Sequence, residues 1–330
     1  VQENFMADVN IQELIDLCAG RKVYVQTHNF PDPDAIASAF GLQKLLEKFN
    51  VQALICHEGQ IDKLSAKKML DLCGIKMLSR EEFEPDMTET DMIVLVDCQK
   101  NNGNTTDLIG DEVAAIDHHP TVVKIDYKYS DLRICGACSS IIAQYYQKLG
   151  VTPDTLVATA LLYGIKMDTL QFTRGVIPFD IQMFEFLFPQ VDNNIMSQLE
   201  RNNMEFDDLR AYGTAIKNVS VFGKSGFTLI DFPCPDAMIA IISDFILSLV
   251  EIEVAVVAAE RPNGMKFSIR SERDDVDAGK LAHDVLGKFG NGGGHAVMAG
   301  GFVPKDKMTE LGTQPFDAFK EMFLQVLPET

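Results

Sequence analysis

Apolar runs typical of buried strands alternate with helical patterns in the first half of the chain, and this alternation restricts the fold more than any other feature. The runs lie at 21–26, 51–56, 91–97 and 112–117. The run at 91–97 is apolar between two aspartates, as expected of a strand buried on both faces. Helical spacing of apolar residues occurs at 35–49, 63–72, 139–149 and 155–166. The alternation predicts an α/β domain with a parallel sheet and helices on both faces.

The second half of the chain has a different pattern. Polar residues multiply between about 180 and 211 while the helical periodicity continues, which predicts a helical connection. Strand patterns follow at 215–222, 227–232, 254–258 and 265–270, with helices from Asp236 and at 278–286. Glycine turns between these strands predict a smaller mixed-sheet α/β domain. We therefore expect domains at 1–190 and 215–330, a helical linker at 191–214, and a helix near 6–18 before the first strand.

Length and charge limit the class of protein. The 330 residues suit two domains, and a net charge of -19 argues against long duplex nucleic acid as a partner, because that needs basic patches. Seven scattered cysteines argue for a reducing compartment. There is no signal-peptide pattern, and the longest apolar run, 237–250, is too short to cross a bilayer. We expect a cytoplasmic protein with no membrane partner.

Acidic and imidazole side chains gather where the predicted strands end. The set comprises His28, Asp32, Asp34, Asp97, Asp117, His118, His119 and, after a helix, Asp168. If these loops share one sheet edge, the carboxylates crowd together, and burying them without partners is costly. Two divalent cations would balance the four charges of Asp32, Asp34, Asp97 and Asp168. Taken singly, each acid is better explained as a helix cap or a solvated loop residue, and only their conjunction favours a metal site.

Oxygen ligands mixed with the imidazoles of His28 and His118 favour Mn²⁺, with Mg²⁺ or Co²⁺ as substitutes. Two such metals about 4 Å apart activate water for an in-line displacement at phosphorus. In the second domain, Gly292, Gly293 and Gly294 allow a phosphate to approach the backbone, and Arg270 offers a planar fork for its oxygens. A flexible turn and a surface strand residue are the alternative explanations for these two features. For Arg174 a surface role is favoured over a phosphate contact.

These motifs, in their order, resemble those of the DHH phosphoesterase family. The four motifs are His28 to Asp34, Val96-Asp97, Asp117-His118-His119 and Lys166 to Thr169. The segment 292–295, preceded by 268–271, resembles the signature of the DHH-associated substrate domain. Together the motifs reach from His28 to Phe302, nearly the whole chain.

The resemblance implies a role for each matching residue. His28 and Asp32 would bind one manganese, and Asp34, His118 and Asp168 the other, with two ions per chain bridged by Asp97. Asp117 would orient an imidazole ligand, and His119 would face the substrate phosphate. Arg270 and His295 would hold the phosphate or nucleotide end from the second domain, across a cleft.

Two-domain chains of this size resemble the nano-RNase branch of the family, which cleaves short oligonucleotides and dephosphorylates pAp. The resemblance implies a hydrolase that converts short oligonucleotides or linear pApA to mononucleotides, or pAp to AMP, by attack of a hydroxide held between two metals. An exopolyphosphatase-like hydrolase and a catalytically inactive nucleotide-binding sensor are the alternatives. The exact substrate, the cleavage direction and the choice between monomer and homodimer stay open.

Overall fold

The computed structural model describes residues 10–61, 63–201, 204, 206 and 208–328. The chain divides into two compact units, Val1–Asn203 and Met204–Thr330. The expected linker at 191–214 contains the helix α8 (Asn193–Glu200), which falls in unit 1, and most of α9 (Asp208–Asn218), which falls in unit 2. Each unit is therefore described by itself.

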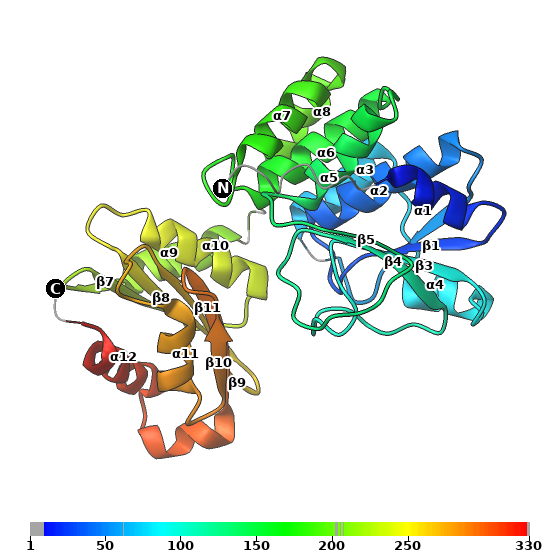
Figure 1. Ribbon diagram of the computed structural model, residues 1–330. Helices are drawn as coiled ribbons and strands as arrows, with labels where there is room; N and C mark the ends of the chain where they lie inside the picture. The colour runs from blue at the N-terminus through cyan, green and yellow to red at the C-terminus, as the bar shows by residue number, and fades with distance from the viewer. Residues whose placement is uncertain (1–9, 62, 202–203, 205, 207, 329–330) are drawn as a thin grey trace. The chain divides into compact units, whose positions relative to one another are not determined.

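Unit 1 is built on a five-stranded parallel sheet (Figure 1). Its strands are β1 (Val23–Gln26), β2 (Ala53–Cys56), β3 (Met92–Val96), β4 (Asp111–Asp117) and β5 (Tyr129–Leu132). They follow the order β2-β1-β3-β4-β5, and all four neighbouring pairs are parallel. The structure thus confirms the parallel sheet, and it adds β5, whose mixed sequence Tyr-Ser-Asp-Leu carries no strand pattern.

Helices cover the two faces of this sheet unequally (Figure 1). The larger core joins the sheet to α1 (Ile11–Cys18), α2 (Pro33–Lys48), α3 (Leu64–Cys73), α5 (Cys138–Lys148), α6 (Thr155–Asp168), α7 (Pro178–Leu187) and α8. The opposite face has a smaller core that includes Tyr24, Ile93 and Phe83, the last from the short helix α4 (Arg80–Phe83). A 3-10 turn at Glu84–Asp86 follows α4, and another at Phe188–Gln190 follows α7. Of the helix predicted near 6–18, residues 6–9 lie outside the described part of the chain.

Unit 2 contains a six-stranded mixed sheet, as the second half of the sequence predicts. Its strands are β6 (Ser220–Phe222), β7 (Ser225–Ile230), β8 (Val254–Arg261), β9 (Gly264–Ser271), β10 (Asn291–Gly294) and β11 (Met298–Pro304), in the order β10-β11-β9-β8-β7-β6. Only β7 and β8 pair in parallel among these described strands. One face packs on α11 (Ala278–Leu286) and α12 (Pro315–Val326), and the other on α9 and α10 (Asp236–Leu247). A 3-10 segment, Lys305–Leu311, precedes α12.

In unit 2 one predicted strand is wrong in its bounds, and one strand was not predicted. The strand expected at 215–222 begins only at Ser220, because the preceding residues continue α9, where Ala215 packs into the core. The glycine-rich stretch, for which no strand was predicted, contains the strand β10, which pairs antiparallel with β11. Glycine is a poor strand former by itself, so tertiary pairing overrides local preference here.

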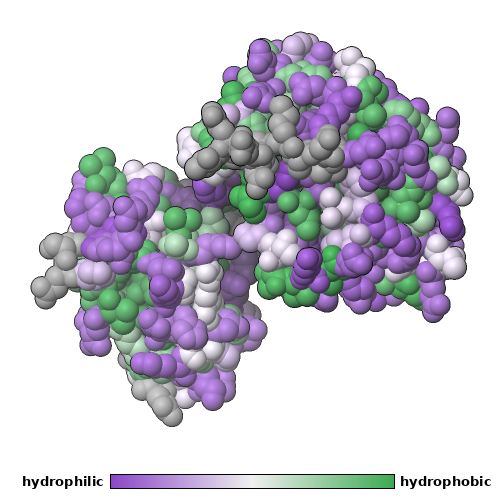
Figure 2. All heavy atoms as spheres, in the orientation of Figure 1, coloured by the Kyte–Doolittle hydropathy of each residue, from purple (hydrophilic) through white to green (hydrophobic). Residues whose placement is uncertain are grey.

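On the face drawn in Figure 2, hydrophilic residues cover much of the surface and apolar residues occur between them in smaller groups. Within the described residues, no helix combines the length and apolar character needed to cross a membrane.

Candidate metal centre

The predicted motifs meet at the point where the winding direction of the unit 1 sheet reverses. The strands β1 and β3 are neighbours, and their chains leave in opposite directions, to β2 on one side and β4 on the other. Ligands of open α/β sheets bind at the carboxyl ends of strands at such a switch point. Asp97 follows β3 directly, His118 follows β4, and Asp32 caps the N-terminus of α2 after β1.

The structure brings all six predicted metal ligands together. Donor atoms of these six residues, joined by His119, form overlapping groups within 4.8 Å, namely His28, Asp32 and Asp97; Asp34, His118 and Asp168; and Asp97, His118 and His119. Nε2 of His118 lies 3.3 Å from Oδ1 of Asp97 and 3.3 Å from Oδ2 of Asp168. Nε2 of His28 lies 3.6 Å from Oδ2 of Asp97 and 3.8 Å from Oδ1 of Asp32. Asp97 therefore stands between the two imidazoles.

Backbone carbonyls orient both of these imidazoles. Nδ1 of His118 lies 3.0 Å from the carbonyl oxygen of Cys135, and Nδ1 of His28 lies 2.8 Å from that of Asn29. A carbonyl oxygen only accepts hydrogen bonds, so Nδ1 carries the proton in each ring. In the neutral ring Nε2 then presents its lone pair to the carboxylates, which is the arrangement that metal-binding histidines require.

Asp34 is held at the N-terminus of α5. Its Oδ2 accepts a hydrogen bond from the backbone N–H of Cys138 (2.7 Å), and its Oδ1 accepts one from that of Ser139 (2.9 Å). These N–H groups have no partner within their own helix, and the helix dipole favours a negative charge there. Gly164 on α6 is required by this packing, because a Cβ there would lie 2.4 Å from Oγ of Ser139.

Asp97 has the features of a residue fixed for function. It is 2% exposed and adopts a φ of 60°, the left-handed region that non-glycine residues rarely enter. Its Oδ1 is buried and accepts no hydrogen bond from the described residues. A buried carboxylate oxygen without a partner is costly, and a cation would satisfy it. The site therefore fits a metal on its own structural evidence.

The pKa values also indicate that the buried carboxylates lack enough positive charge around them. Burial raises the pKa of Asp34 to about 7, and the neighbouring charge of Asp97 adds to this shift. Burial likewise raises the pKa of Asp168 to about 6, with a further contribution from Asp34. For the histidines burial lowers the pKa, but the adjacent carboxylates outweigh it and bring the pKa of His28 to about 9 and that of His118 to about 11. Without metal, the imidazoles act as the counter-charges that divalent ions would provide.

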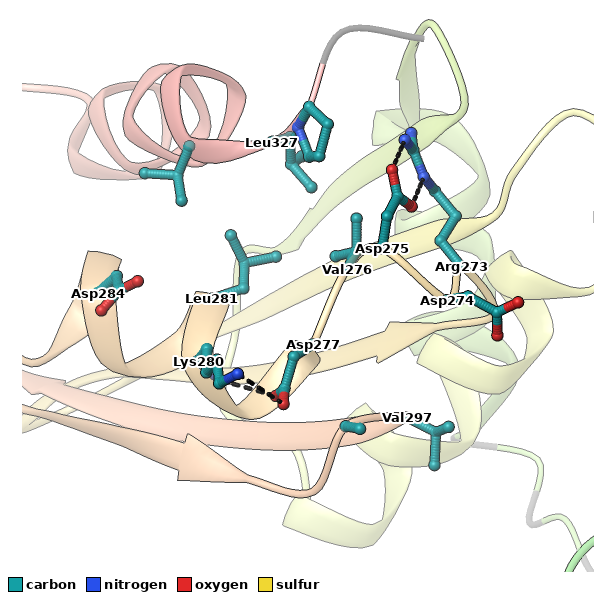
Figure 3. A pocket seen from close by; sticks show the side chains of 13 residues that line it. Arg273, Asp274, Asp275, Val276, Asp277, Lys280, Leu281, Asp284, Val297 and Leu327 are labelled. Atoms are coloured by element: carbon teal, nitrogen blue, oxygen red, sulfur yellow. Dashed lines mark hydrogen bonds and ion pairs between the residues drawn. The ribbon is translucent and has the colours of Figure 1, made fainter.

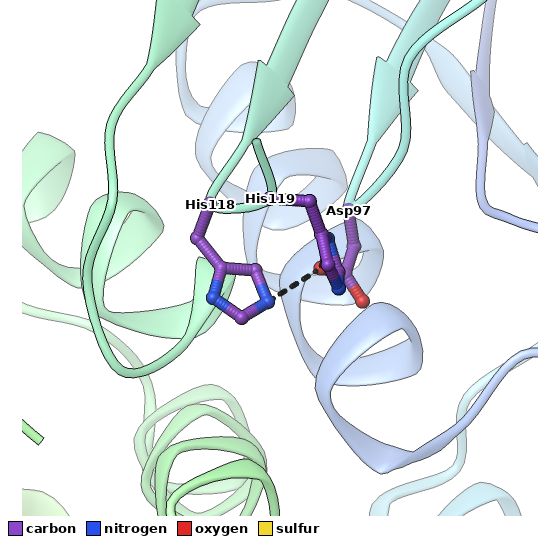
Figure 4. Close-up of side chains that lie close together, drawn as sticks. All are labelled: Asp97, His118 and His119. Carbon is purple, nitrogen blue, oxygen red and sulfur yellow. Dashed lines mark ion pairs between the residues drawn. The ribbon is translucent and has the colours of Figure 1, made fainter. Parts of the chain in front are cut away.

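The side chain of Asp117 contacts the imidazole of His119, which is not one of the two predicted imidazole ligands. Its Oδ1 lies 2.8 Å from Nδ1 of His119 and also accepts the backbone N–H of His118 at 2.8 Å. Its Oδ2 accepts a hydrogen bond from Nε2 of Gln99 (2.7 Å), a residue that sequence reasoning missed. The side chain of His119 is 47% exposed and packs beside that of His118 (Figure 4). Asp117 thus fixes the ring of His119 at the open side of the cluster.

Arg174 lies closer to the cluster than its predicted surface role implies. Its Nη2 donates to the carbonyl oxygen of Asp168 (3.0 Å) and lies 4.0 Å from Oδ1 of the same residue. The intervening turn contains three consecutive non-glycine residues with positive φ, Leu170, Gln171 and Phe172. Such conformations cost about 1–2 kcal/mol per residue. The strained turn brings the guanidinium of Arg174 back to Asp168.

The predicted substrate residues of unit 2 lie near one another in the backbone pairing. Arg270 on β9 pairs with Met298 on β11, whose carbonyl oxygen accepts the N–H of His295 (2.7 Å). The guanidinium of Arg270 already has a partner, since its Nε donates to Oδ1 of Asp244 (2.6 Å). His295 is exposed.

Packing accounts for part of the glycine signature. A Cβ on Gly292 would lie 2.3 Å from the carbonyl oxygen of Ala282 on α11, and one on Gly294 would lie 2.6 Å from Cα of Ala299. Gly293 has open space at the same point, with nothing within 4 Å. The close approach of β10 to α11 therefore requires Gly292, whereas no neighbouring atom requires glycine at position 293.

Unit 2 also contains a pocket of about 460 Å³. Arg273 and Lys280 line it together with four aspartates, and they form ion pairs with Asp275 and Asp277 respectively (Figure 3). Arg270 and His295 are not among the lining residues. The pocket is therefore distinct from the predicted substrate residues.

The fold and the cluster together define a two-domain α/β protein with a candidate divalent-metal centre on its parallel sheet. Residues 22–165 match the family model described as DHH family, N-terminal domain, and residues 223–325 match the DHHA1 domain. The chain therefore carries the N-terminal domain of the DHH family together with a DHHA1 domain.

Relatives of this chain match most of it or about half of it. An uncharacterized protein of Methanocaldococcus jannaschii, MJ1633, is 29% identical over 85% of this chain. A probable manganese-dependent inorganic pyrophosphatase of Bacillus mycoides is 29% identical over 46% of this chain. The chain spans 57% and 49% of the lengths of these two relatives. The crystal structure of an exopolyphosphatase-related protein from Bacteroides fragilis has a TM-score of 0.74 at 18% identity, covering 95% of this chain and 96% of that one, which shows a common fold.

Proposed function

We propose that this chain is a metal-dependent phosphoesterase that hydrolyses short oligonucleotides or linear dinucleotides such as pApA, or the monoester of pAp. The observation that carries the proposal is the convergence of His28, Asp32, Asp34, Asp97, His118 and Asp168 at one switch point of a DHH-family domain. A set of four carboxylates and two imidazoles has few uses other than binding cations.

Two divalent ions are the proposed cofactor, with manganese first because a relative is named as manganese-dependent. His28, Asp32 and Asp97 would hold one ion, and Asp34, Asp97, His118 and Asp168 the other. When bound, such ions supply Lewis-acid polarisation of a phosphoryl oxygen and lower the pKa of water. Oδ1 of Asp97 is buried and accepts no hydrogen bond from the described residues, although Nε2 of His118 lies 3.3 Å from it, and this supports the proposed bridging role of Asp97.

The remaining residues of the site would bind and orient the phosphoryl group. Asp117 fixes His119 through Nδ1, so its exposed ring can donate from Nε2 when protonated. That hydrogen bond is the main cause of the raised pKa of His119. Arg174 would hold a phosphate oxygen with the nitrogens that Asp168 leaves free, because guanidinium groups bind phosphate through paired N–H donors. Both cationic groups would stabilise charge that develops on the phosphoryl oxygens.

A nucleotide substrate is supported by the loop that carries the first motif. Phe30 lies between His28 and Asp32, is 64% exposed, and adopts a φ of 56°, a conformation that bulky residues rarely enter. An exposed aromatic ring beside a phosphate site offers a surface on which a nucleobase can stack. The net charge of -19 favours short substrates over long strands.

The alternative is an exopolyphosphatase-like hydrolase, favoured by the shared fold with the Bacteroides protein. A hydrolysis screen with Mn²⁺ against pAp, pApA, a short RNA and polyphosphate separates the two functions. We expect turnover of the nucleotides and loss of that turnover in Asp97→Asn. Turnover of polyphosphate alone would favour the alternative. Nucleotide binding without turnover would identify a sensor, and the proposal would then be wrong.

A further inference from the structure

The segment 135–140 leads from the loop after β5 into the first turn of α5, and it touches two of the proposed metal ligands, His118 and Asp34. The carbonyl oxygen of Cys135 faces Nδ1 of His118 at 3.0 Å. The N–H groups of Cys138 and Ser139 donate to the two carboxylate oxygens of Asp34. One short segment therefore fixes the orientation of the His118 ring and of the Asp34 carboxylate.

A buried carboxylate on another helix holds this segment in place. Asp180, in the first turn of α7, is fully buried. Its Oδ2 accepts hydrogen bonds from the backbone N–H groups of Gly136 (2.9 Å) and Ile177 (2.9 Å). Its Oδ1 accepts one from the hydroxyl of Ser140 (2.6 Å). These contacts fix both ends of the part of the segment that faces Asp34 and His118.

The packing around Gly136 leaves the segment no room to move towards Asp180. A Cβ on Gly136 would lie 2.6 Å from Oδ2 of Asp180 and 2.7 Å from Cγ2 of Thr169. Thr169 directly follows Asp168, and its hydroxyl donates to the carbonyl oxygen of Ile165 (2.6 Å). The segment is thus packed between Asp180 and the end of α6 that carries Asp168.

We propose that Asp180 is a positioning residue of the metal centre, which preorganises Asp34 and His118 through the segment 135–140. The inference rests on the proposed metal site, because it concerns the orientation of two residues that would bind the ions. Asp180 is 44 residues from Gly136 in sequence, and its hydrogen bonds go to Gly136, Ser140 and Ile177 rather than to the ligands. Removing a residue that orients a metal ligand typically weakens the affinity for the metal about 10–100-fold.

The test measures Mn²⁺ affinity by titration calorimetry and by the EPR signal of free Mn²⁺, together with the melting temperature. Asp180→Ala removes all three acceptor bonds, and we expect its dissociation constant for Mn²⁺ to rise about 10–100-fold. Asp180→Asn retains an oxygen for the two N–H groups, and its amide can donate to Oγ of Ser140, so we expect it to restore most of the affinity. Tyr146→Phe is the matched control, because it removes one buried hydrogen bond, to the carbonyl oxygen of Gly41, away from the segment.

Two results would overturn the proposal. One is a folded Asp180→Ala protein whose Mn²⁺ affinity is within twofold of the wild type. The other is an equal loss of affinity in Tyr146→Phe, which would show that stability alone is responsible. If Asp180→Ala does not fold, Ser140→Ala decides instead, since it removes a single bond; a severalfold weaker affinity supports the proposal and an unchanged one refutes it. A wild-type protein that binds no Mn²⁺ would refute the metal site itself, which is a separate outcome.

Discussion

At the scale of single residues, the structure explains why these acids are tolerated in a buried site. The backbone N–H groups at the start of α5 neutralise part of the charge of Asp34, and His28 and His118 face Asp97 from two sides. The sequence predicted this set of residues because their types and positions after strands are visible in one dimension. It missed Asp180 and Gln99, since an acid in the first turn of a helix and a glutamine in a loop carry no signal for contacts across 44 and 18 residues.

Asp97→Asn should abolish turnover while leaving the fold intact. The amide keeps the shape of the side chain but loses the charge shared between the two proposed metal groups. We expect the rate to fall more than about 100-fold, beyond the usual effect of a residue outside the ligand set. The measurement is kcat with pApA at saturating Mn²⁺, with circular dichroism as the check on folding. A variant at wild-type rate would contradict the assignment.

Phe30→Ala should distinguish a nucleobase contact from a purely phosphate-directed site. Stacking contributes about 1–3 kcal/mol per base, so KM for pApA should rise about 5–150-fold with a smaller change in kcat. Phe30→Tyr keeps the ring and serves as the control. Hydrolysis of a base-free phosphoester by the same variants should stay unchanged. An equal loss on both substrates would show that Phe30 acts on the loop rather than on the base.

At the scale of elements, prediction succeeded where local pattern and tertiary environment agree. The helix α11 begins and ends where apolar spacing placed it, at 278 and 286, and the buried run of β3 reads directly as a strand. The strands β5 and β10 were missed because their sequences, Tyr-Ser-Asp-Leu and Asn-Gly-Gly-Gly, have no strand preference. Their neighbours β4 and β11 supply the hydrogen bonds that fix them.

The packing of β10 on α11 can be tested with two glycines of the same strand. Gly292→Ala would place a methyl group 2.3 Å from the carbonyl oxygen of Ala282, so the backbones must move apart. We expect a loss of about 1–3 kcal/mol in the free energy of unfolding, as for other overpacked sites. Gly293→Ala meets open space and should change stability by less than about 1 kcal/mol. Urea denaturation of unit 2 measures both, and equal losses would argue against this account of the signature.

At the scale of the whole molecule, each unit has a hydrophobic core of its own. The candidate metal centre lies entirely in unit 1, whereas the packing of Gly292 lies in unit 2. Ligand binding stabilises only the part of a protein that folds to form the site. Two separate cores could not be derived from charge or length alone, but the change of pattern near 180–211 indicated them.

Mn²⁺ should raise the melting temperature of unit 1 much more at pH 8 than at pH 5.5. In the metal-free protein, Asp34 and Asp168 have a raised pKa, of about 7 and about 6, so the folded state holds their protons more tightly than the unfolded state. Their contribution to stability is therefore present at acid pH and is lost as the pH rises towards 7. The raised pKa values of His28 and His118, about 9 and about 11, act in the same direction, since their stabilisation is lost as the pH rises through those values. Protons thus compete with metal at low pH, and metal offsets the carboxylate repulsion at high pH.

Calorimetric scans with and without Mn²⁺ at the two pH values check this prediction. At a free-metal concentration 100 times the dissociation constant, the stabilisation is about 2.7 kcal/mol, and it shrinks as protonation weakens binding at pH 5.5. Mn²⁺ should raise the melting temperature of unit 1 and leave that of unit 2 unchanged. The Gly292→Ala variant lowers the melting temperature of unit 2 and so identifies which transition belongs to which unit. A metal effect of equal size at both pH values would mean that Asp34 and Asp168 need not lose protons on binding. These two carboxylates would then not be ligands, however well they are placed.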